Sequence, residues 1–243
     1  MTSRSNARRL TRPLARCVIA CLLAACSDNA ESATASPGHD LPPAGDQLFT
    51  KLPSNATGVR FENRLEQSKS FNVFTYRNFY NGGGAAIADL TGDGLPEIVL
   101  TGNESGPRLY LNRGKFAFRD VTDASGITSA RDSWTTGVAI ADVNNDGKLD
   151  IYISKAGQGE PAVRANELWI NQGVDRNGVP TFKDMARQYG VADEGYTTQA
   201  AFLDYDGDGD LDLFVVNNSP KPANSFNLRT SRSDRGQYGG ERL

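Results

Sequence analysis

The chain has 243 residues with 26 Lys or Arg and 29 Asp or Glu, which gives a formal net charge of −3. This length allows one or two domains with a sizeable core. The only histidine is His39, so histidine-dependent nucleophilic and acid–base schemes are excluded, and the acidic balance argues against nucleic acid as a partner.

Residues 1–25 have the composition of a signal peptide. Residues 1–16 contain five arginines and no acid, and the apolar stretch after them is shorter than the about 20 residues that a membrane-spanning helix needs. Residues 23–26, Leu-Ala-Ala-Cys, resemble the bacterial lipobox, in which the chain is cut before a cysteine that is then lipidated. The resemblance implies lipidation at Cys26, and Ser27 after it implies an exported protein anchored at the outer membrane. An ordinary signal peptide with a chance cysteine is the alternative.

Residues 26–46 are polar and contain proline and glycine, which predicts a lipid-anchored flexible tether. All three cysteines lie at or before Cys26, so the rest of the chain has no disulfide to stabilise it. Without residues 1–25, 21 basic and 29 acidic residues remain, a net charge of −8. Bound calcium is the remaining candidate for a stabilising cross-link.

Three stretches, 89–97, 142–150 and 204–212, share one register of oxygen-bearing side chains at positions 1, 3, 5 and 9. A glycine at position 6 lets the backbone turn sharply. Calcium takes six to eight oxygen ligands, which these side chains, a backbone carbonyl at position 7 and a water can supply. The predicted ligands are Asp89, Thr91, Asp93, Glu97, Asp142, Asn144, Asp146, Asp150, Asp204, Asp206, Asp208 and Asp212.

These loops admit two other interpretations. An EF-hand needs Glu at position 12 and flanking helices, but position 12 is Leu100, Ile153 or Val215 and the flanks look like strands. Asp, Asn and Gly also gather in tight turns without any metal. Threefold recurrence, and the mutual repulsion of four aspartates in the last loop, favour a cation. The first loop departs most from the pattern, because it has Thr at position 3 and Glu at position 9.

A larger repeat surrounds the loops. Leu-aromatic-x-Asn-x-Gly occurs at 109–114 and 168–173, and a Phe-led segment ending near Gly follows at 118–127 and 182–191. Each unit therefore contains four strand-like segments, which is typical of a β-propeller blade. The sequence predicts an all-β fold, a partial β-propeller with two complete blades and the start of a third over residues 47–219. The Asn-x-Gly groups are interpreted as hairpin turns, and the aromatic residues Tyr110, Phe118, Trp169 and Phe182 as core between blades.

Residues 81–89, 134–142 and 196–204 resemble the FG-GAP or VCBS repeats of integrin α-type propellers. More closely, they are similar to the cartilage acidic protein and ASPIC/UnbV group. The resemblance implies that the Asp-rich loop joins the first two strands of a blade and binds calcium. None of the copies reads Phe-Gly-x-Gly-Ala-Pro. Residues 220–243 contain no further repeat, so we expect a disordered tail, a truncated reading frame and an unpaired blade edge.

These patterns together predict a non-catalytic module of a surface lipoprotein that binds an extracellular protein or glycan and holds up to three structural Ca²⁺ ions. No catalytic residue is assigned. Two alternatives stay open: a calcium-dependent, glycan-active enzyme scaffold, and an inactive fragment of a longer propeller protein.

Overall fold

The computed structural model of the chain describes residues 49–129 and 133–218. Several predictions fall outside these residues: the signal peptide (1–25), lipidation at Cys26, the tether (26–46) and the tail (220–243). The chain divides into two compact units, Met1–Thr50 and Lys51–Leu243. The fold described below is that of the second unit.

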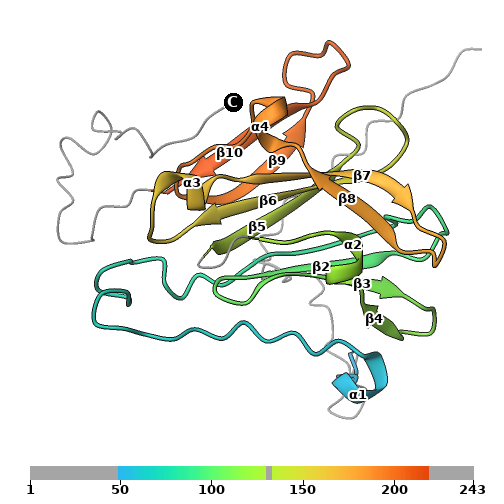
Figure 1. Cartoon of the computed structure of the whole chain (residues 1–243), viewed down its shortest axis with the longest axis horizontal. Coiled ribbons are helices and arrows are strands. Elements are labelled where there is room, and N and C mark those ends of the chain that lie inside the picture. Colours follow the sequence, from blue (N-terminus) through green and yellow to red (C-terminus); the bar gives the residue numbers. More distant parts are fainter. Residues whose placement is uncertain (1–48, 130–132, 219–243) are drawn as a thin grey trace, which may run out of the picture. The chain divides into compact units, whose positions relative to one another are not determined.

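Ten strands form three antiparallel sheets within the described residues (Figure 1). The first sheet contains β1 (Ala85–Ala88), β2 (Glu97–Gly102), β3 (Gly106–Asn112) and β4 (Phe118–Asp120). The second contains β5 (Trp134–Ala141), β6 (Asp150–Ala156), β7 (Glu167–Val174) and β8 (Pro180–Asp184). The third contains β9 (Thr197–Leu203) and β10 (Asp212–Asn217).

Each sheet is built in chain order. The strand orders are β1-β2-β3-β4 and β5-β6-β7-β8, and β9 pairs with β10. Adjacent strands are antiparallel and joined by short connections, as expected for meanders of hairpins. The prediction of an all-β fold from antiparallel strand units is therefore confirmed, whereas the closure of these sheets into a propeller stays a prediction.

The helices of the described part are single turns: α1 (Ser54–Thr57), α2 (Thr122–Ser125), α3 (Pro161–Arg164) and α4 (Ala186–Tyr189). The sequence predicted only strand-like structure where α2 and α4 occur, after β4 and β8. These turns end at Gly126 and Gly190, whose φ angles of 82° and 74° lie in the left-handed region that glycine favours. Among the residues placed, no helix has the length and apolar character needed to span a membrane.

The described part of the chain before β1 contains α1 and no strand, although it was included in the predicted blade region 47–219. It packs along the first sheet through specific contacts. The Asn63 side-chain amide donates to the Asn103 side-chain oxygen at 2.9 Å, and a Cβ added to Gly102 would lie only 2.7 Å from Cζ of Phe61. Further along, Tyr76 and Phe79 pack with Trp134 at the start of β5.

The first and second sheets enclose the main apolar core. Half of its buried members come from the first repeat and half from the second, and Trp169 and Phe182 are among them, as predicted. Tyr110 is also buried, at 2% exposure, but does not belong to this core, and Phe118 is half-buried. The buried residues of the core are Leu90, Val99, Leu109, Leu111, Val121, Ile127, Val138, Ile151, Ile153, Trp169, Val179 and Phe182.

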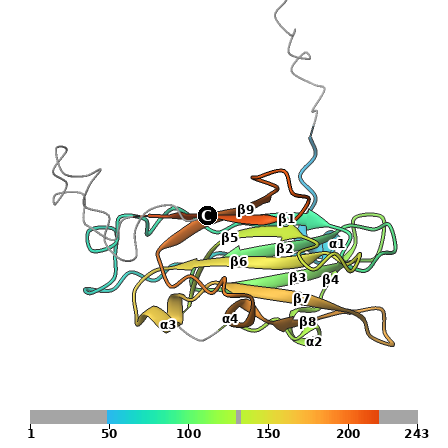
Figure 2. The same cartoon turned by 90° about the horizontal axis from the view of Figure 1, so that it is seen from above.

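A second core lies between the second and third sheets. Its buried members are Tyr152, Leu168, Ile170, Ala186, Ala200 and Val215. The first strands of the three sheets, β1, β5 and β9, lie close together in Figure 2, and β5 contacts both β1 and β9. The three Asp-rich loops, each of which follows one of these strands, therefore begin close together in space.

Candidate metal centre

Each Asp-rich loop connects the first and second strands of a sheet. In all three, the residue before position 1 pairs with the residue at position 9: Ala88 with Glu97, Ala141 with Asp150, and Leu203 with Asp212. The predicted placement of the loops on hairpins is confirmed. The side chains at positions 1, 3 and 5 are mostly exposed, so the loops present oxygen atoms to solvent at the ends of the sheets.

The aspartate at position 1 organises its own loop. One carboxylate oxygen of Asp89, Asp142 or Asp204 accepts a hydrogen bond from the backbone N–H of the glycine at position 6, at 2.7, 2.8 and 3.2 Å respectively. Those glycines have φ angles of 82°, 81° and 94°, and a Cβ added to any of them would meet no atom within 4 Å. The glycine is therefore needed for its backbone conformation and not for space.

The charge of these loops is stabilised in different ways. Burial opposes ionisation of Asp89, but hydrogen bonds from the N–H groups of Gly94, Gly92 and Asp93 outweigh it and lower the pKa of this carboxyl. In the second loop, hydrogen bonds from the side chain and backbone of Lys148 lower the pKa of Asp146. The Lys148 Nζ lies 2.8 Å from Asp146 Oδ2, so a positive charge already stands beside this predicted ligand.

The acid at position 9 has a role that the sequence analysis missed. One oxygen of Glu97 accepts from the N–H of Leu90, at position 2, and the other from the N–H of Asn112 on β3, at 2.9 and 3.2 Å. Asp150 repeats this arrangement with Val143 and Asn171, at 3.0 and 2.8 Å. Both carboxyls are buried, and burial raises the pKa of each despite these hydrogen bonds.

The Asn of each Asn-x-Gly group adds to these hydrogen bonds, and together they form a bracket that joins each loop to the third strand of its sheet. Its side-chain amide donates to the carbonyl at position 8 of the loop: Asn112 to Pro96 at 2.8 Å, and Asn171 to Leu149 at 3.1 Å. The side-chain oxygen of each accepts from the glycine two residues later, which is the predicted turn. The signal that could have revealed the bracket is the recurrence of Asn at the same place in both units.

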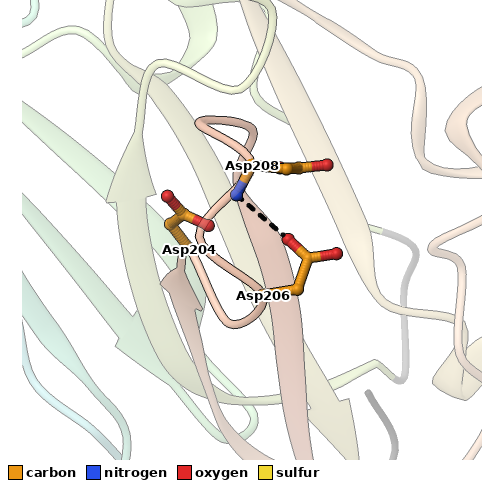
Figure 3. Close-up of side chains that lie close together, drawn as sticks. All are labelled: Asp204, Asp206 and Asp208. Atoms are coloured by element: carbon orange, nitrogen blue, oxygen red, sulfur yellow. Dashed lines mark hydrogen bonds between the residues drawn. The ribbon is translucent and has the colours of Figure 1, made fainter.

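The third loop alone brings three carboxylates together within the described residues. Asp204, Asp206 and Asp208 each offer an oxygen within 4.8 Å of the others, and all three are exposed. Figure 3 shows them around one turn, where the N–H of Asp208 donates to Asp206 at 3.3 Å. Asp212 lies outside this group, and one of its oxygens accepts from the N–H of Tyr205 at 2.9 Å.

The first two loops do not form such a group, because position 3 is not an acid. Thr91 donates its hydroxyl to Asp89 at 3.3 Å, and the Asn144 side-chain oxygen accepts from the N–H of Asp146 at 3.1 Å. The donor set of the third loop fits a hard divalent cation best. Its exposed carboxylates repel one another, and the ion pairs of the described residues include none of the three.

Comparison with known proteins agrees with this repeat arrangement. Residues 89–153 match the family model of the FG-GAP-like repeat, a span that includes the whole first and second loops. The chain is 34% identical over 140 residues to cartilage acidic protein 1 of Mus musculus and of Homo sapiens. It is 26% identical over 169 residues to a T-cell immunomodulatory protein homolog of Plasmodium yoelii yoelii.

These alignments cover 56% of the chain for cartilage acidic protein 1 and 61% for the Plasmodium protein. The chain spans only about a fifth of the length of these relatives, between 20% and 22%. The predicted resemblance to FG-GAP repeats and to the cartilage acidic protein group is supported at this level.

Proposed function

We propose that the chain is a calcium-binding, non-catalytic module of β-propeller type, in which the ions stabilise the Asp-rich hairpins. The observation that carries the proposal is the carboxylate group of Asp204, Asp206 and Asp208, with oxygens within 4.8 Å of one another on an exposed turn. The same position in the other two sheets is occupied by loops of the same register. A cation removes the repulsion between such carboxylates.

The residues that would hold the ion follow from the register. Side-chain oxygens at positions 1, 3 and 5 and the carbonyl at position 7 are present in each loop, although Asp146 in the second loop is paired with Lys148. The carboxylate at position 9 accepts hydrogen bonds from backbone N–H groups in all three loops. Bound calcium supplies positive charge and a cross-link within the turn. With a dissociation constant of about 10⁻³ M and a tenfold excess of calcium, each site stabilises the fold by about 1.4 kcal/mol.

We place the module outside the cell, held to the bacterial outer membrane through a lipid on Cys26, with an extracellular protein or glycan as its ligand. The support is the arginine-rich and then apolar composition of residues 1–25 and the lipobox-like sequence ending at Cys26. The non-catalytic role is supported by the matched repeat type and by the structural use of the buried acids Glu97 and Asp150, which bind backbone N–H groups.

The test is a calcium titration of the purified chain by calorimetry, with thermal unfolding measured in calcium and in excess chelator. We expect heat of binding at submillimolar to millimolar calcium and a melting temperature that falls when calcium is chelated. Unchanged melting and no heat up to about 10 mM calcium, well above the weakest extracellular sites, would refute the metal proposal. Turnover on a panel of polysaccharides would refute the non-catalytic one.

A further inference from the structure

The third sheet is shorter than the other two in the described residues. β10 pairs with β9 along one edge, and no described strand pairs with its other edge. In the second sheet, the corresponding edge of β6 pairs with β7. A cavity of about 690 Å³ lies against this edge. Its apolar lining includes Val143, Leu168, Val191, Phe202, Leu213 and Val215.

Each of these lining residues has an equivalent in the filled core between the first and second sheets. Counted along the repeat, the equivalents are Leu90, Leu109, Ile127, Ile140, Ile151 and Ile153. That core contains three further buried residues from β7, β8 and the turn between them: Trp169, Val179 and Phe182. No described residue takes their place beside the third sheet. The cavity is therefore the space that a second copy of these three side chains would fill.

The hydrogen-bonding groups at the edge show the same gap. Asp150 accepts from Val143 N–H with one oxygen and from Asn171 N–H, on β7, with the other. Asp212 accepts from Tyr205 N–H, and within residues 49–129 and 133–218 it has no donor equivalent to Asn171. An unpaired strand edge beside an apolar cavity is the usual receptor for an added β-strand.

We propose that the edge of β10 and the adjoining cavity form a docking site for a β-hairpin with the side-chain pattern of β7–β8. The register of β6 and β7, in which Ile151 is opposite Trp169, places the aromatic residue of the incoming strand opposite Leu213. Its Asn, two residues later, would donate to Asp212. The Phe of the second strand would fill the rest of the cavity, as Phe182 does in the first core.

We assign the site to a further segment of this repeat type, because filling it needs the Leu-aromatic-x-Asn pattern of β7, and residues 219–243 do not contain that pattern. Three acids, Asp193, Glu194 and Asp212, also line the cavity. The contacts proposed for the incoming aromatic side chains are nevertheless apolar and those of the strand edge are backbone hydrogen bonds, so we expect the peptide to bind in chelator as well as in calcium. Its failure and the failure of the calcium proposal are therefore distinguishable.

A synthetic peptide with the sequence of residues 167–184 tests the site on the full chain, with and without calcium. We expect saturable one-to-one binding and slower amide hydrogen exchange in residues 212–217. A control peptide carrying Trp169→Ala and Phe182→Ala should bind at least about tenfold more weakly, since buried aromatic anchors dominate such interfaces. Equal binding of the two peptides, no binding at millimolar peptide, or protection elsewhere would overturn the proposal.

Variants of the chain separate the remaining outcomes. Leu211→Arg, at a cavity-lining residue that is 47% exposed, should abolish peptide binding, whereas Leu95→Arg, at a 39% exposed residue in the first loop, should not. Peptide binding only after removal of residues 219–243 would assign the cavity to that segment instead. A dimer that Leu211→Arg dissociates and the peptide does not would assign it to a second copy. Either result would overturn the proposed occupant.

Discussion

The side-chain amide of Asn171 donates to the carbonyl of Leu90 at 3.0 Å, across 81 positions of the chain. The same amide donates to Leu149 at 3.1 Å, and the backbone N–H of Asn171 donates to Asp150 at 2.8 Å. One buried asparagine on β7 therefore ties the second Asp-rich loop to the first. The equivalent residue in the first sheet, Asn112, reaches only its own loop, at Pro96.

Asn171→Ala should destabilise the chain by about 2–3 kcal/mol, because it removes the donor from two carbonyls in a site where the residue is only 2% exposed. Asn112→Ala should cost about 1 kcal/mol, since that side chain is partly exposed and serves one carbonyl outside its turn. Denaturant unfolding of both variants measures the difference. Equal losses would contradict the bridging role of Asn171.

Asp208→Asn should weaken calcium binding at the third loop by about tenfold, or about 1.4 kcal/mol. In chelator the same variant should be at least as stable as the parent chain, because one of three mutually repelling carboxylates is neutralised. Asp210→Asn is the matched control: it lies in the same loop, but its side chain is not a predicted ligand. Calorimetry and melting curves with and without calcium give the readout, and similar affinities for the two variants would argue against Asp208 as a ligand.

Gly147→Ala should destabilise the second hairpin by about 1–2 kcal/mol, because alanine must adopt the φ of 81° that glycine has there. Gly147→Asn should cost less, since asparagine tolerates this region, as Asn145 does in the same loop at φ 55°. A Cβ at residue 147 meets no atom within 4 Å, so crowding does not complicate the comparison. The prediction fails if the two substitutions have the same effect on unfolding in chelator.

The pH dependence of stability should contain a contribution from Glu97. Burial raises its pKa above the ordinary 4.5, so the folded chain binds more protons than the unfolded chain between the two values. Stability should therefore fall as pH rises through that interval and be constant in this contribution outside it. This fall in the free energy of unfolding should be absent in Glu97→Gln when unfolding is followed in chelator from acid to neutral pH.

Glu160→Gln serves as the control for this measurement, because Glu160 is exposed. The Glu160→Gln chain should keep the fall in stability of the parent chain, because Glu97 is still present in it. A Glu97→Gln profile parallel to that of the parent chain would mean that the carboxyl titrates alike in the folded and unfolded chain.

Much of the site could be predicted because its determinants are local. Short runs of apolar, mostly small residues before Asp89, Asp142 and Asp204 predict a strand, and the loop register predicts a hairpin with glycine at position 6. Where the prediction was incomplete, the contacts are long-range. The bracket formed by Asn171 with Asp150 and Leu90 joins residues 21 and 81 positions apart, which no short motif encodes.

The sequence by itself determined the repeat, the strand-like segments of each unit and the position of the oxygen-rich turns, because each depends on residues close together in the chain. Only the tertiary structure decided which acids are exposed and which are buried. Glu97 and Asp150 are enclosed by the third strand of their sheets, whereas Asp204, Asp206 and Asp208 meet at an open turn. The packing of neighbouring sheets also decided where the apolar core is filled and where, beside β10, a cavity remains.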